Sequence, residues 1–400
     1  MASDSNNHYD IVIAGAGPAG LSFARALATS GLNIAVIEKS PQHILANPPQ
    51  DGRDIALTHS SEAIMKELDI WAQVPDSCIG IIRHAQVLNG NSPYSLHFDH
   101  HDTDKDYLGH IIANHVIRKA AYDALSDFDT VNIICETEVT SVATGANAAS
   151  VTLSDDRVLD CSLVIAADSR FSTTRRKMGI AASMLDFGRV VIVCQMQHER
   201  PHNDTAYECF HYDRTLAVLP LPGNNSSIVL TLSAEHSEEV LKMEPETFNQ
   251  DIARRFDRRL GPMKLTSKRH PYPLVAVYAK QFTTTRFALI GDAAVGMHPV
   301  TAHGFNLGLS GAYTLAQEIR LALAHGEDIA SSSVLEAYQS KHRRLSRPLY
   351  VGTNALVRLY TNDHLPARIL RQAMLHLGNA LPPVKRAIMD QLTKAQPSTT

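Results

Sequence analysis

Three glycines near the amino terminus stand at a spacing suited to binding a pyrophosphate. Gly15, Gly17 and Gly20 form the pattern G-x-G-x-x-G within YDIVIAGAGPAG, and Ala19 lies inside the same turn. In this pattern the first glycine allows a tight turn, the second lets the backbone approach phosphate oxygens, and the third lets a helix lie close to the preceding strand. Pro18 suits the first turn of that helix, because the N–H that it lacks would have no partner there.

The elements around these glycines complete a strand–turn–helix–strand unit. The apolar run 11–13 predicts a buried strand, Gly31 ends the helix, and residues 33–37 predict a second strand. Glu38 follows this strand, where a carboxylate can accept hydrogen bonds from ribose hydroxyls. The unit therefore predicts a dinucleotide site, and the carboxylate favours FAD or NAD over a nucleotide with a 2′-phosphate.

Composition favours a globular protein of two domains and gives no overall attraction to nucleic acid. The chain has 400 residues, of which 44% are hydrophobic and 20% charged, with a formal net charge of −4. Five scattered cysteines, never at C-x-x-C spacing, predict reduced thiols rather than disulfides or a zinc site. Since the first ten residues do not resemble a secretory signal, a cytoplasmic protein is expected.

Two later segments place a carboxylate at the end of a buried strand. An apolar strand over 163–167 leads to Asp168, and Ser172 is expected to cap the helix that follows. A strand over 287–290 leads to Asp292 and then to a glycine-rich turn and a long helix. Ligands of open α/β sheets bind beyond the carboxyl ends of the strands, so both aspartates are candidates for the dinucleotide site.

The loop after the first unit carries Arg53 and must pass near the glycine turn. Arg53 is either a phosphate or flavin contact or a solvated surface arginine. Ser60 is expected to cap the next helix, whose apolar residues Ile64, Leu68 and Trp71 fall on one face.

A histidine-rich segment in the region 81–110 invites a metal interpretation. His97, His100, His101 and Asp102 lie within HFDHHD, but no further ligands follow along the chain at zinc spacing. We therefore expect a solvated loop here and no metal site.

The carboxyl-terminal segment is basic and partly apolar. Between Lys341 and Arg386 it has nine basic residues and one acidic residue, Asp363, with leucines and other apolar residues at helical spacing. One interpretation is a helical pair with a basic outer face. The other is a surface that binds anionic lipid of the inner membrane or proteins of a biosynthetic complex.

Three separated segments together resemble the FAD-dependent aromatic hydroxylases with the p-hydroxybenzoate hydroxylase fold, the group A flavoprotein monooxygenases. They are GAGPAG with Glu38, IAADSRFSTTRR, and LIGDAAVGMHPVTAHGFNLGL. Within this group GRDIALTHSS, YECFHYDRTLAVLPL and YPLVAVYA are most similar to the ubiquinone-biosynthesis hydroxylases, close to the demethoxyubiquinol hydroxylases. The resemblance covers nearly the whole chain.

The resemblance implies an α/β fold: a discontinuous Rossmann-like FAD-binding domain, an inserted antiparallel β-sheet substrate domain and a C-terminal helical segment. The expected boundaries are 1–80, 111–187 and 279–338 for the FAD-binding domain, 81–110 and 188–278 for the substrate domain, and 339–400 for the C-terminal helical region.

The resemblance also assigns cofactor contacts. It implies that the following residues bind FAD: Gly15, Gly17 and Gly20 at the pyrophosphate, Glu38 at the adenosine ribose, Arg53 and Arg118 at the phosphate or flavin, Asp168 also at the nicotinamide, Asp292 at the ribityl or pyrophosphate, Gly304, Phe305 and Asn306 at the flavin ring, and Ala19, Lys39 and Val139 as further cofactor-binding residues. The family's usual Gly-Ala-Asp-Gly is Ala166-Ala167-Asp168-Ser169 here, which changes the backbone beside Asp168.

On the substrate side the resemblance implies that Pro299 lines the pocket, with the sheet around 210–221 as the opposite wall. His298 is a candidate proton donor or a structural histidine. His303 stands where a glutamine is more common, so it is a candidate for tuning flavin or substrate protonation.

The implied reaction uses NADH or NADPH to reduce FAD and O₂ to form a C4a-hydroperoxyflavin, which hydroxylates the aromatic ring of a polyprenylated phenol or benzoquinol in ubiquinone biosynthesis. Two alternatives stay open. One is a prenyl-lipid flavin reductase of the same fold, and the other is a non-catalytic flavin-binding scaffold of a biosynthetic complex.

Overall fold

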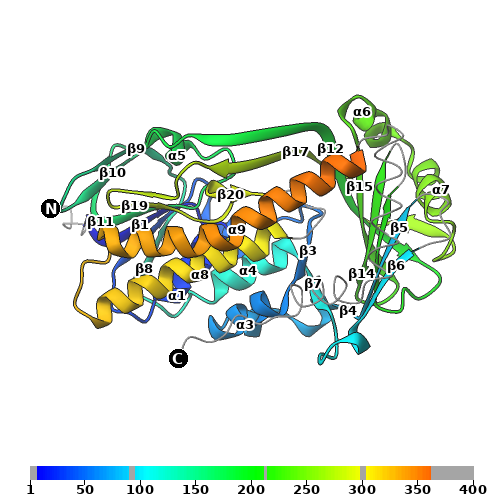
Figure 1. Cartoon of the computed structure of the whole chain (residues 1–400), viewed down its shortest axis with the longest axis horizontal. Coiled ribbons are helices and arrows are strands. Elements are labelled where there is room, and N and C mark those ends of the chain that lie inside the picture. Colours follow the sequence, from blue (N-terminus) through cyan, green and yellow to red (C-terminus); the bar gives the residue numbers. More distant parts are fainter. Residues whose placement is uncertain (1–6, 90–94, 211–213, 298–302, 362–400) are drawn as a thin grey trace.

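Three β-sheets and the helices on their outer faces make up the described part of the chain (Figure 1). This computed structural model describes residues 7–89, 95–210, 214–297 and 303–361. The α/β class predicted from the sequence is confirmed, and the sheets explain how distant segments meet.

The first sheet is built on a parallel core with the glycine turn at its centre. Its parallel strands lie in the order β19 (Phe287–Leu289), β11 (Val158–Ala166), β1 (His8–Ala14), β2 (Ile34–Ile37) and β8 (Val131–Ile134). β18 (Thr283–Thr284), β10 (Ala149–Leu153) and β9 (Val139–Thr144) extend it with antiparallel pairs. Parallel strands end at one edge of the sheet, so the segments after β1, β2, β11 and β19 lie together.

Four helices pack around this sheet and bury its apolar strands. They are α1 (Pro18–Leu27), α4 (Asn114–Asp123), α8 (His303–Ala324) and α9 (Ser332–Thr361). α1 is buried from Gly20 to Leu27 because it lies against the sheet on one side and α8 on the other. α9 runs alongside α8 (Figure 1). Among the helices that the structure describes, none combines the length and the apolar character needed to cross a membrane.

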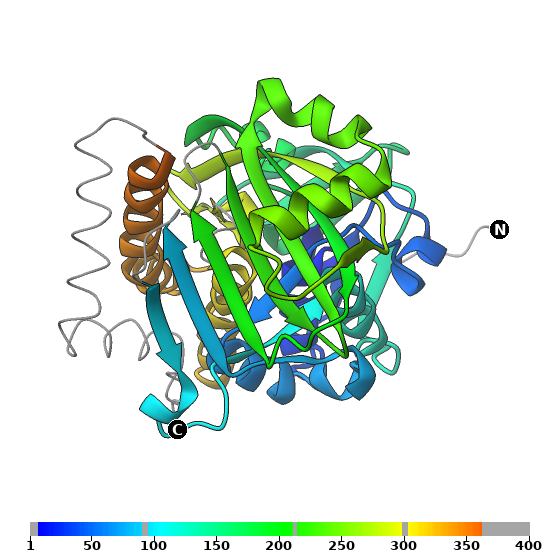
Figure 2. The same cartoon turned by 90° about the vertical axis from the view of Figure 1, so that its right-hand side faces the viewer.

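The second sheet carries helices on one face only (Figure 2). Its strands lie in the order β20 (Val295–Gly296), β17 (His270–Ala279), β12 (Ala182–His198), β15 (Asn225–Ser233), β14 (Thr215–Leu221), β13 (Thr205–Phe210), β5 (His84–Asn89) and β6 (Ser95–Asp99), with β16 (Met263–Leu265) beside β12. All pairs are antiparallel except β5 with β13. α6 (Ala234–Lys242) and α7 (Pro245–Arg255) cover the outer face, where Phe248 and Ile252 pack on Ile192 and Leu230.

The opposite face of this sheet, here called the inner face, is turned toward the rest of the molecule. Leu219 and Leu221 of β14 pack there with Ile111 of a small third sheet. That sheet has the order β3 (Asp54–Leu57), β7 (Gly109–Ala113) and β4 (Gly80–Ile82). The inner face is therefore an apolar surface that packs against the third sheet.

β12 and β17 form a long antiparallel ribbon that joins the two large sheets. Their register shifts between Asp186 and Val190, and Gly188 between them has a positive φ of 62°. The domain boundary expected at 187/188 falls inside this ribbon, at the irregularity. The five domain boundaries stay a prediction.

Side-chain caps fix two of the shorter helices. The hydroxyl of Ser172 accepts a hydrogen bond from Arg175 N at 2.9 Å, so the predicted cap of α5 (Thr173–Lys177) is confirmed. The predicted cap at Ser60 is wrong. α3 (His59–Glu67) begins earlier, because Thr58 has extended backbone and accepts from Ser61 N at 3.3 Å. α2 (Gln42–Ala46) completes the helices of the described chain.

The predicted carboxyl-terminal helical region is described only as far as residue 361, within α9. Two of its basic residues are tied to the body of the protein. Lys341 forms an ion pair with Glu318 at 2.6 Å, and Arg343 donates to the carbonyl of Lys280 at 3.0 Å. Arg344 and Arg347 are exposed.

The packing of α8 on α9 predicts opposite effects of one substitution at two helical glycines. A Cβ at Gly311 of α8 would lie 2.7 Å from the buried ring of His342, whereas a Cβ at Gly352 of α9 would meet nothing within 4 Å. Replacing glycine by alanine inside a helix gains roughly 1 kcal/mol of propensity at either site. We expect Gly352→Ala to be neutral or stabilising and Gly311→Ala to lose about 1–3 kcal/mol to overpacking, measured by urea unfolding. Equal stability of the two variants would contradict this packing.

Candidate active site

The glycine turn after β1 is held by backbone contacts that leave no room for side chains. Gly15 has a φ of +111°, and a Cβ there would lie 2.7 Å from the carbonyl oxygen of Ala167. A Cβ at Gly20 would lie 2.1 Å from the carbonyl oxygen of Gly15. Gly17 differs, because a Cβ there would meet no protein atom within 4 Å, and no side chain caps the helix that begins beyond it. The turn thus leaves space and free N–H groups at Gly17, as pyrophosphate binding requires.

Glu38 lies beside this turn, at the carboxyl end of β2. Its two carboxylate oxygens accept hydrogen bonds from Ala16 N at 3.0 Å and from Ser40 N at 2.9 Å. Lys39 is exposed, and Val139 is close in space because Thr137 N donates to the Glu38 carbonyl at 3.2 Å. Glu38, Lys39 and Val139, all assigned to the cofactor, therefore lie in one region.

Asp168 follows β11 and has one oxygen without a partner. Its Oδ2 accepts from Thr174 N at 3.2 Å, but its Oδ1 is buried and has no hydrogen bond. The neighbouring Ala167 packs against the glycine turn, and Ser169 is exposed. A buried oxygen without a partner costs free energy, so Asp168 Oδ1 is suited to accept a hydrogen bond from a bound group.

Asp292 follows β19 and is joined to the Asp168 segment by two arginines. Arg170 donates to Asp292 at 3.1 Å, and Arg175 donates to the carbonyl of Ala293 at 2.8 Å. Arg175 is only 2% exposed. Burial lowers the pKa of its guanidinium, although the charge of Asp168 works in the other direction.

The backbone at Gly291 brings this segment onto the first turn of α1. A Cβ at Gly291 would lie 2.8 Å from the Cβ of Ala19, and a Cβ at Gly308 of α8 would lie 3.3 Å from the Cα of Gly291. The loops after β1 and β19 and the first turns of α1 and α8 are thus in contact.

Arg53 does not stand alone beside this site. Its guanidinium donates to Asp51 Oδ2 at 2.6 Å and lies 5.4 Å from the ring of Tyr272. Asn114 Nδ2 also donates to Asp51 Oδ2, at 2.8 Å. Burial acts to raise the pKa of Asp51, but these hydrogen bonds and the Arg53 charge outweigh it and hold the pKa below its ordinary value. The sequence interpretation missed Asp51, although it lies only two residues before Arg53.

Arg118 lies one helical turn after Asn114 on α4. Within the described chain it makes no hydrogen bond or ion pair, so its guanidinium is available to an anion. His115, its neighbour, has a pKa lowered by burial and by the charge of Arg118.

The start of α8 contacts the β3 side of the site. Asn306 donates to the carbonyl of Ala56 at 2.8 Å and accepts from Thr58 N at 3.1 Å. Gly304 faces open space, and His303 and Phe305 are half-buried. His298 and Pro299 lie outside the described residues.

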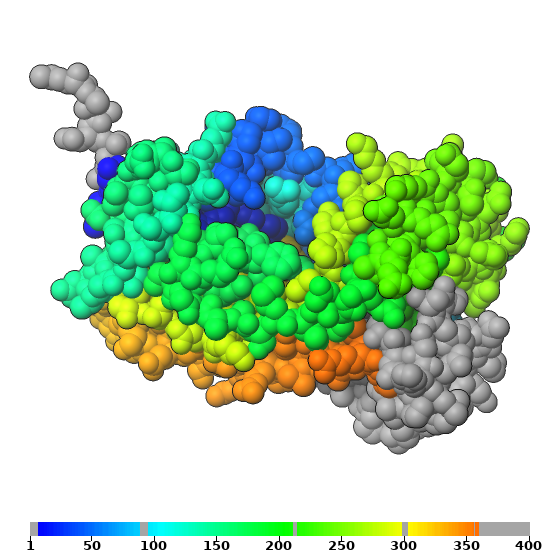
Figure 3. Space-filling model, turned by 90° about the horizontal axis from the view of Figure 1, so that it is seen from above, coloured from blue at the N-terminus to red at the C-terminus, as the bar shows by residue number. Residues whose placement is uncertain are grey.

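The surface is hollowed where these segments meet (Figure 3). The dark-blue N-terminal segment lies at its floor, with the blue segment around residue 50 and the green segment around residue 180 on two sides. Three features of the segments described above fit a dinucleotide: the open space at Gly17, the Asp168 Oδ1 without a hydrogen bond among the described residues, and the Arg118 guanidinium, which forms no ion pair with them. The described residues therefore fit FAD as the bound dinucleotide.

A lone carboxyl group stands on the inner face of the second sheet. Tyr207 and Cys209 of β13 pack toward α7, so Glu208 between them points to the inner face, next to Val87 and Ala217 in the register. Glu208 is half-buried and forms no hydrogen bond or ion pair with the residues that the structure describes, and burial raises the pKa of its carboxyl to about 8. The sequence analysis did not identify Glu208, although a single charged residue in an otherwise apolar strand could have indicated a functional residue.

A second carboxyl group lies at the start of β3. Asp54 accepts a hydrogen bond from Gln195 Nε2 of β12 at 3.1 Å. Burial raises its pKa to about 6, against the effect of its hydrogen bonds. Both carboxyl groups sit between the second sheet and the rest of the chain, where the surroundings disfavour charge.

Comparison with known proteins identifies relatives along the whole chain. The FAD binding domain family model matches residues 8–350. The ubiquinone hydroxylase UbiM of Neisseria meningitidis is 49% identical over 390 residues, which cover 96% of this chain and 85% of that protein. The ubiquinone hydroxylase UbiL of Rhodospirillum rubrum is 30% identical over 380 residues, covering 95% and 88%.

Solved structures agree on the fold. PqsL of Pseudomonas aeruginosa, described as a probable FAD-dependent monooxygenase, superposes with a TM-score of 0.77 at 19% identity, covering 89% of this chain and 97% of its own. The p-nitrophenol 4-monooxygenase PnpA of Pseudomonas putida gives a TM-score of 0.76 at 18% identity, covering 96% and 97%. At these identities the likeness concerns the fold alone.

The open space at Gly17 predicts a substitution that separates cofactor binding from folding. Gly17→Ala adds a methyl group that touches no protein atom within 4 Å but would enter the space assigned to the pyrophosphate. We expect the flavin-free variant to keep its melting temperature and to bind FAD at least roughly tenfold more weakly by fluorescence titration, a loss of about 1.4 kcal/mol. Gly145→Ala, in a distant turn with ordinary contacts, is the control. Unchanged FAD affinity of Gly17→Ala would place the pyrophosphate elsewhere.

Proposed function

The chain belongs to the FAD-binding domain family and is an FAD-dependent monooxygenase, and on that premise we propose that it hydroxylates the aromatic ring of a polyprenylated phenol or benzoquinol in ubiquinone biosynthesis. The observation that carries the proposal is the likeness to UbiM at 49% identity over nearly the full chain. The second relative, UbiL, bears the same description as a ubiquinone hydroxylase.

The cofactor does the oxygen chemistry, and the chain positions it. When bound and reduced by NADH or NADPH, FAD would supply the activation of O₂, from which the transferred oxygen atom comes. In this proposal Gly17 and the start of α1 hold the pyrophosphate, Glu38 receives the ribose, and Arg118 offers a cation to a phosphate. Asn306 keeps the start of α8 fixed against β3 through its two hydrogen bonds, so the flavin would meet a rigid wall.

The inner face of the second sheet is suited to an aromatic ring with an apolar tail. Its residues around β13 and β14 are apolar, among them Ala206, Leu219 and Leu221, and they exclude water from the ring. Glu208 is the exception. With a pKa raised to about 8 it carries its proton at neutral pH, so it can donate a hydrogen bond to a phenol or quinol oxygen.

The exposed side of α9 supports contact with a lipid surface that holds such a substrate. Arg344 and Arg347 are exposed there, together with the apolar side chains of Leu345 and Val351, which are 41% and 58% exposed. Cationic and apolar groups side by side favour anionic membranes. We propose this side of α9 as the contact that brings the protein to the inner membrane.

Isotope labelling tests the hydroxylase activity directly. Purified protein with FAD, NADH or NADPH, ¹⁸O₂ and a short-chain demethoxyubiquinol is expected to give a product with one ¹⁸O atom, with nicotinamide oxidation stimulated by the substrate. A prenyl-lipid reductase would give a reduced product without ¹⁸O, and a scaffold would give neither product nor oxidation. Either result would refute the proposed hydroxylation.

The alkaline limb of the reaction tests the assignment of Glu208. Below pH 8 its carboxyl is protonated and donates, and above pH 8 the proton and the hydrogen bond are lost, so kcat/KM for the wild type should fall as pH rises through about 8. Glu208→Gln keeps a neutral donor, so that fall should disappear. Glu208→Ala should lower kcat/KM by up to roughly tenfold at neutral pH, because a neutral hydrogen bond contributes about 0.5–1.5 kcal/mol.

The controls for this test are flavin content and the reduction of flavin by nicotinamide without substrate. Both should match the wild type in the two variants, since Glu208 lies on β13 and none of the residues assigned to FAD belongs to that strand. An alkaline limb that persists in Glu208→Gln would remove this residue from substrate binding.

A further inference from the structure

The β5–β6 hairpin brings together two residues that are far apart in the sequence. In its antiparallel register His84 of β5 pairs directly with Asp99 of β6. His100 follows Asp99 at the start of a short 3₁₀ turn, His100–Asp102. Directly opposed residues in a sheet have their Cβ atoms about 4.5–5.5 Å apart, so the three side chains can meet at one point.

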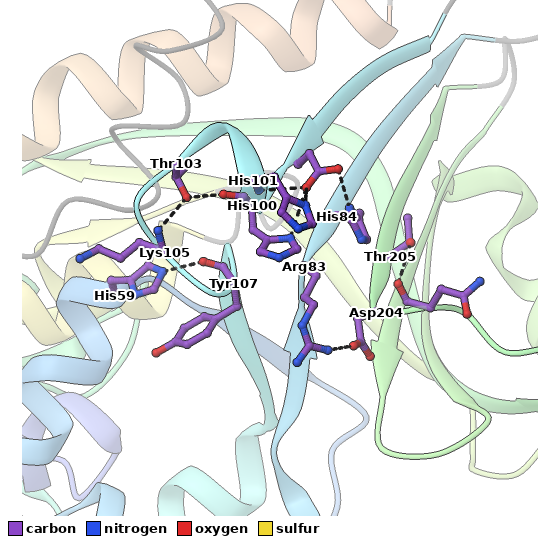
Figure 4. A network of polar contacts seen from close by, with 12 residues as sticks. His59, Arg83, His84, His100, His101, Thr103, Lys105, Tyr107, Asp204 and Thr205 are labelled. Carbon is purple, nitrogen blue, oxygen red and sulfur yellow. Dashed lines mark hydrogen bonds and ion pairs between the residues drawn. The ribbon is translucent and has the colours of Figure 1, made fainter.

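The rings of His84 and His100 lie close to each other (Figure 4), with their centroids 5.4 Å apart. His84 Nδ1 lies 3.3 Å from Asp99 Oδ2, and His100 Nδ1 lies 3.3 Å from Asp99 Oδ1. All three donor atoms lie within 4.8 Å of one another. Ligands about 2.0–2.1 Å from a tetrahedral zinc ion are separated by roughly 3.3–3.4 Å, a length that each imidazole nitrogen already has to one of the two Asp99 oxygens.

The two imidazole nitrogens lack the hydrogen bonds that would otherwise explain their position. Among the residues that the structure describes, His84 Nδ1 and His100 Nδ1 have no hydrogen-bond partner, although both atoms are buried. Their side chains are 27% and 13% exposed, so an ion could still reach them from solvent. Buried nitrogens of this kind are costly unless something else binds them.

We propose that His84, Asp99 and His100 bind a divalent transition-metal ion of the zinc class. Two imidazoles and one carboxylate are borderline ligands that suit Zn²⁺, and three protein ligands leave the fourth position to water. His101 is a neighbour outside the ligand set: its Nδ1 lies 2.8 Å from Asp99 Oδ1, and its side chain is largely exposed.

This site is separate from the candidate flavin site. It sits on β5, β6 and the 3₁₀ turn, at the edge of the second sheet that is farthest along the strand order from β12. An ion there would join the end of β6 to β5 and so stabilise an edge hairpin. Ligand spacing along the chain does not reveal this site, because His84 joins the other two residues only through the strand register.

Calorimetry with zinc chloride tests the site in the full chain. The FAD-loaded protein is prepared without a histidine tag, treated with a chelator and dialysed before titration with Zn²⁺ alone. We expect saturable binding of one ion per chain and a higher melting temperature in its presence. His84→Ala and Asp99→Ala should each weaken that binding at least roughly tenfold, while flavin content and circular dichroism confirm that both variants fold.

His101→Ala is the matched control, since His101 is 76% exposed, lies beside the same carboxylate and is outside the ligand set. It should keep the binding of one ion. The proposal is overturned if the wild type shows no saturable binding, if His84→Ala binds zinc as the wild type does, or if His101→Ala loses the ion while His84→Ala keeps it.

Discussion

The structure depends on a close approach of backbones at the carboxyl edge of the first sheet. The turn at Gly15 lies so near Ala167 and Asp168 that a single Cβ would collide with both, and Gly20 lies equally near Gly15. β1 is central in the parallel order, between β11 and β2, so this contact also fixes where Glu38 and Asp168 can stand. Only glycine fits these two positions, because a Cβ would be strained at the positive φ of Gly15 and would clash with neighbouring backbone at both Gly15 and Gly20. Every other feature of the candidate site is arranged around this contact.

Charged side chains then connect the loops that surround the turn. Arg170 and Arg175 start from one segment and reach Asp292 and the Ala293 carbonyl in another, more than a hundred residues away. Arg175 is almost completely buried and satisfied largely by carbonyl oxygens, which is costly to disrupt because removing one partner leaves a buried charge or a buried carbonyl. These contacts hold the two aspartates in a fixed relation before any ligand arrives, as a preorganised site requires.

The parts of this arrangement that are local in sequence could be predicted, and the parts that depend on tertiary contacts could not. The glycine turn, the buried strands and the cap at Ser172 follow from residue types within one or two helical turns. The cap predicted at Ser60 was wrong because Thr58, two residues earlier, also carries a hydroxyl that can cap a helix. Residue types do not decide between the two, whereas the extended backbone of Thr58 does. The pairing of Arg53 with Asp51 could have been predicted, since both residues lie in one loop.

The directions of the Glu208 and His84 side chains could not be predicted, for a different reason. The direction of Glu208 depends on which face of β13 carries α7, and the partner of His84 depends on the register of β5 with β6. A shift of one residue in either register would turn each side chain to the opposite face.

The two large sheets are held together because the β12–β17 ribbon runs from one to the other. β12 and β17 pair from Ala182 with Ala279 up to Val193 with His270, and Tyr272 of β17 donates to the Asp51 carbonyl at 2.7 Å beside Arg53. Asp54 is joined to Gln195 of β12 in the same way. A displacement of the second sheet would therefore break contacts of the Arg53 loop as well. The wall that carries Glu208 is thus held in register with the glycine turn, and a ring bound between them would keep one orientation toward the flavin.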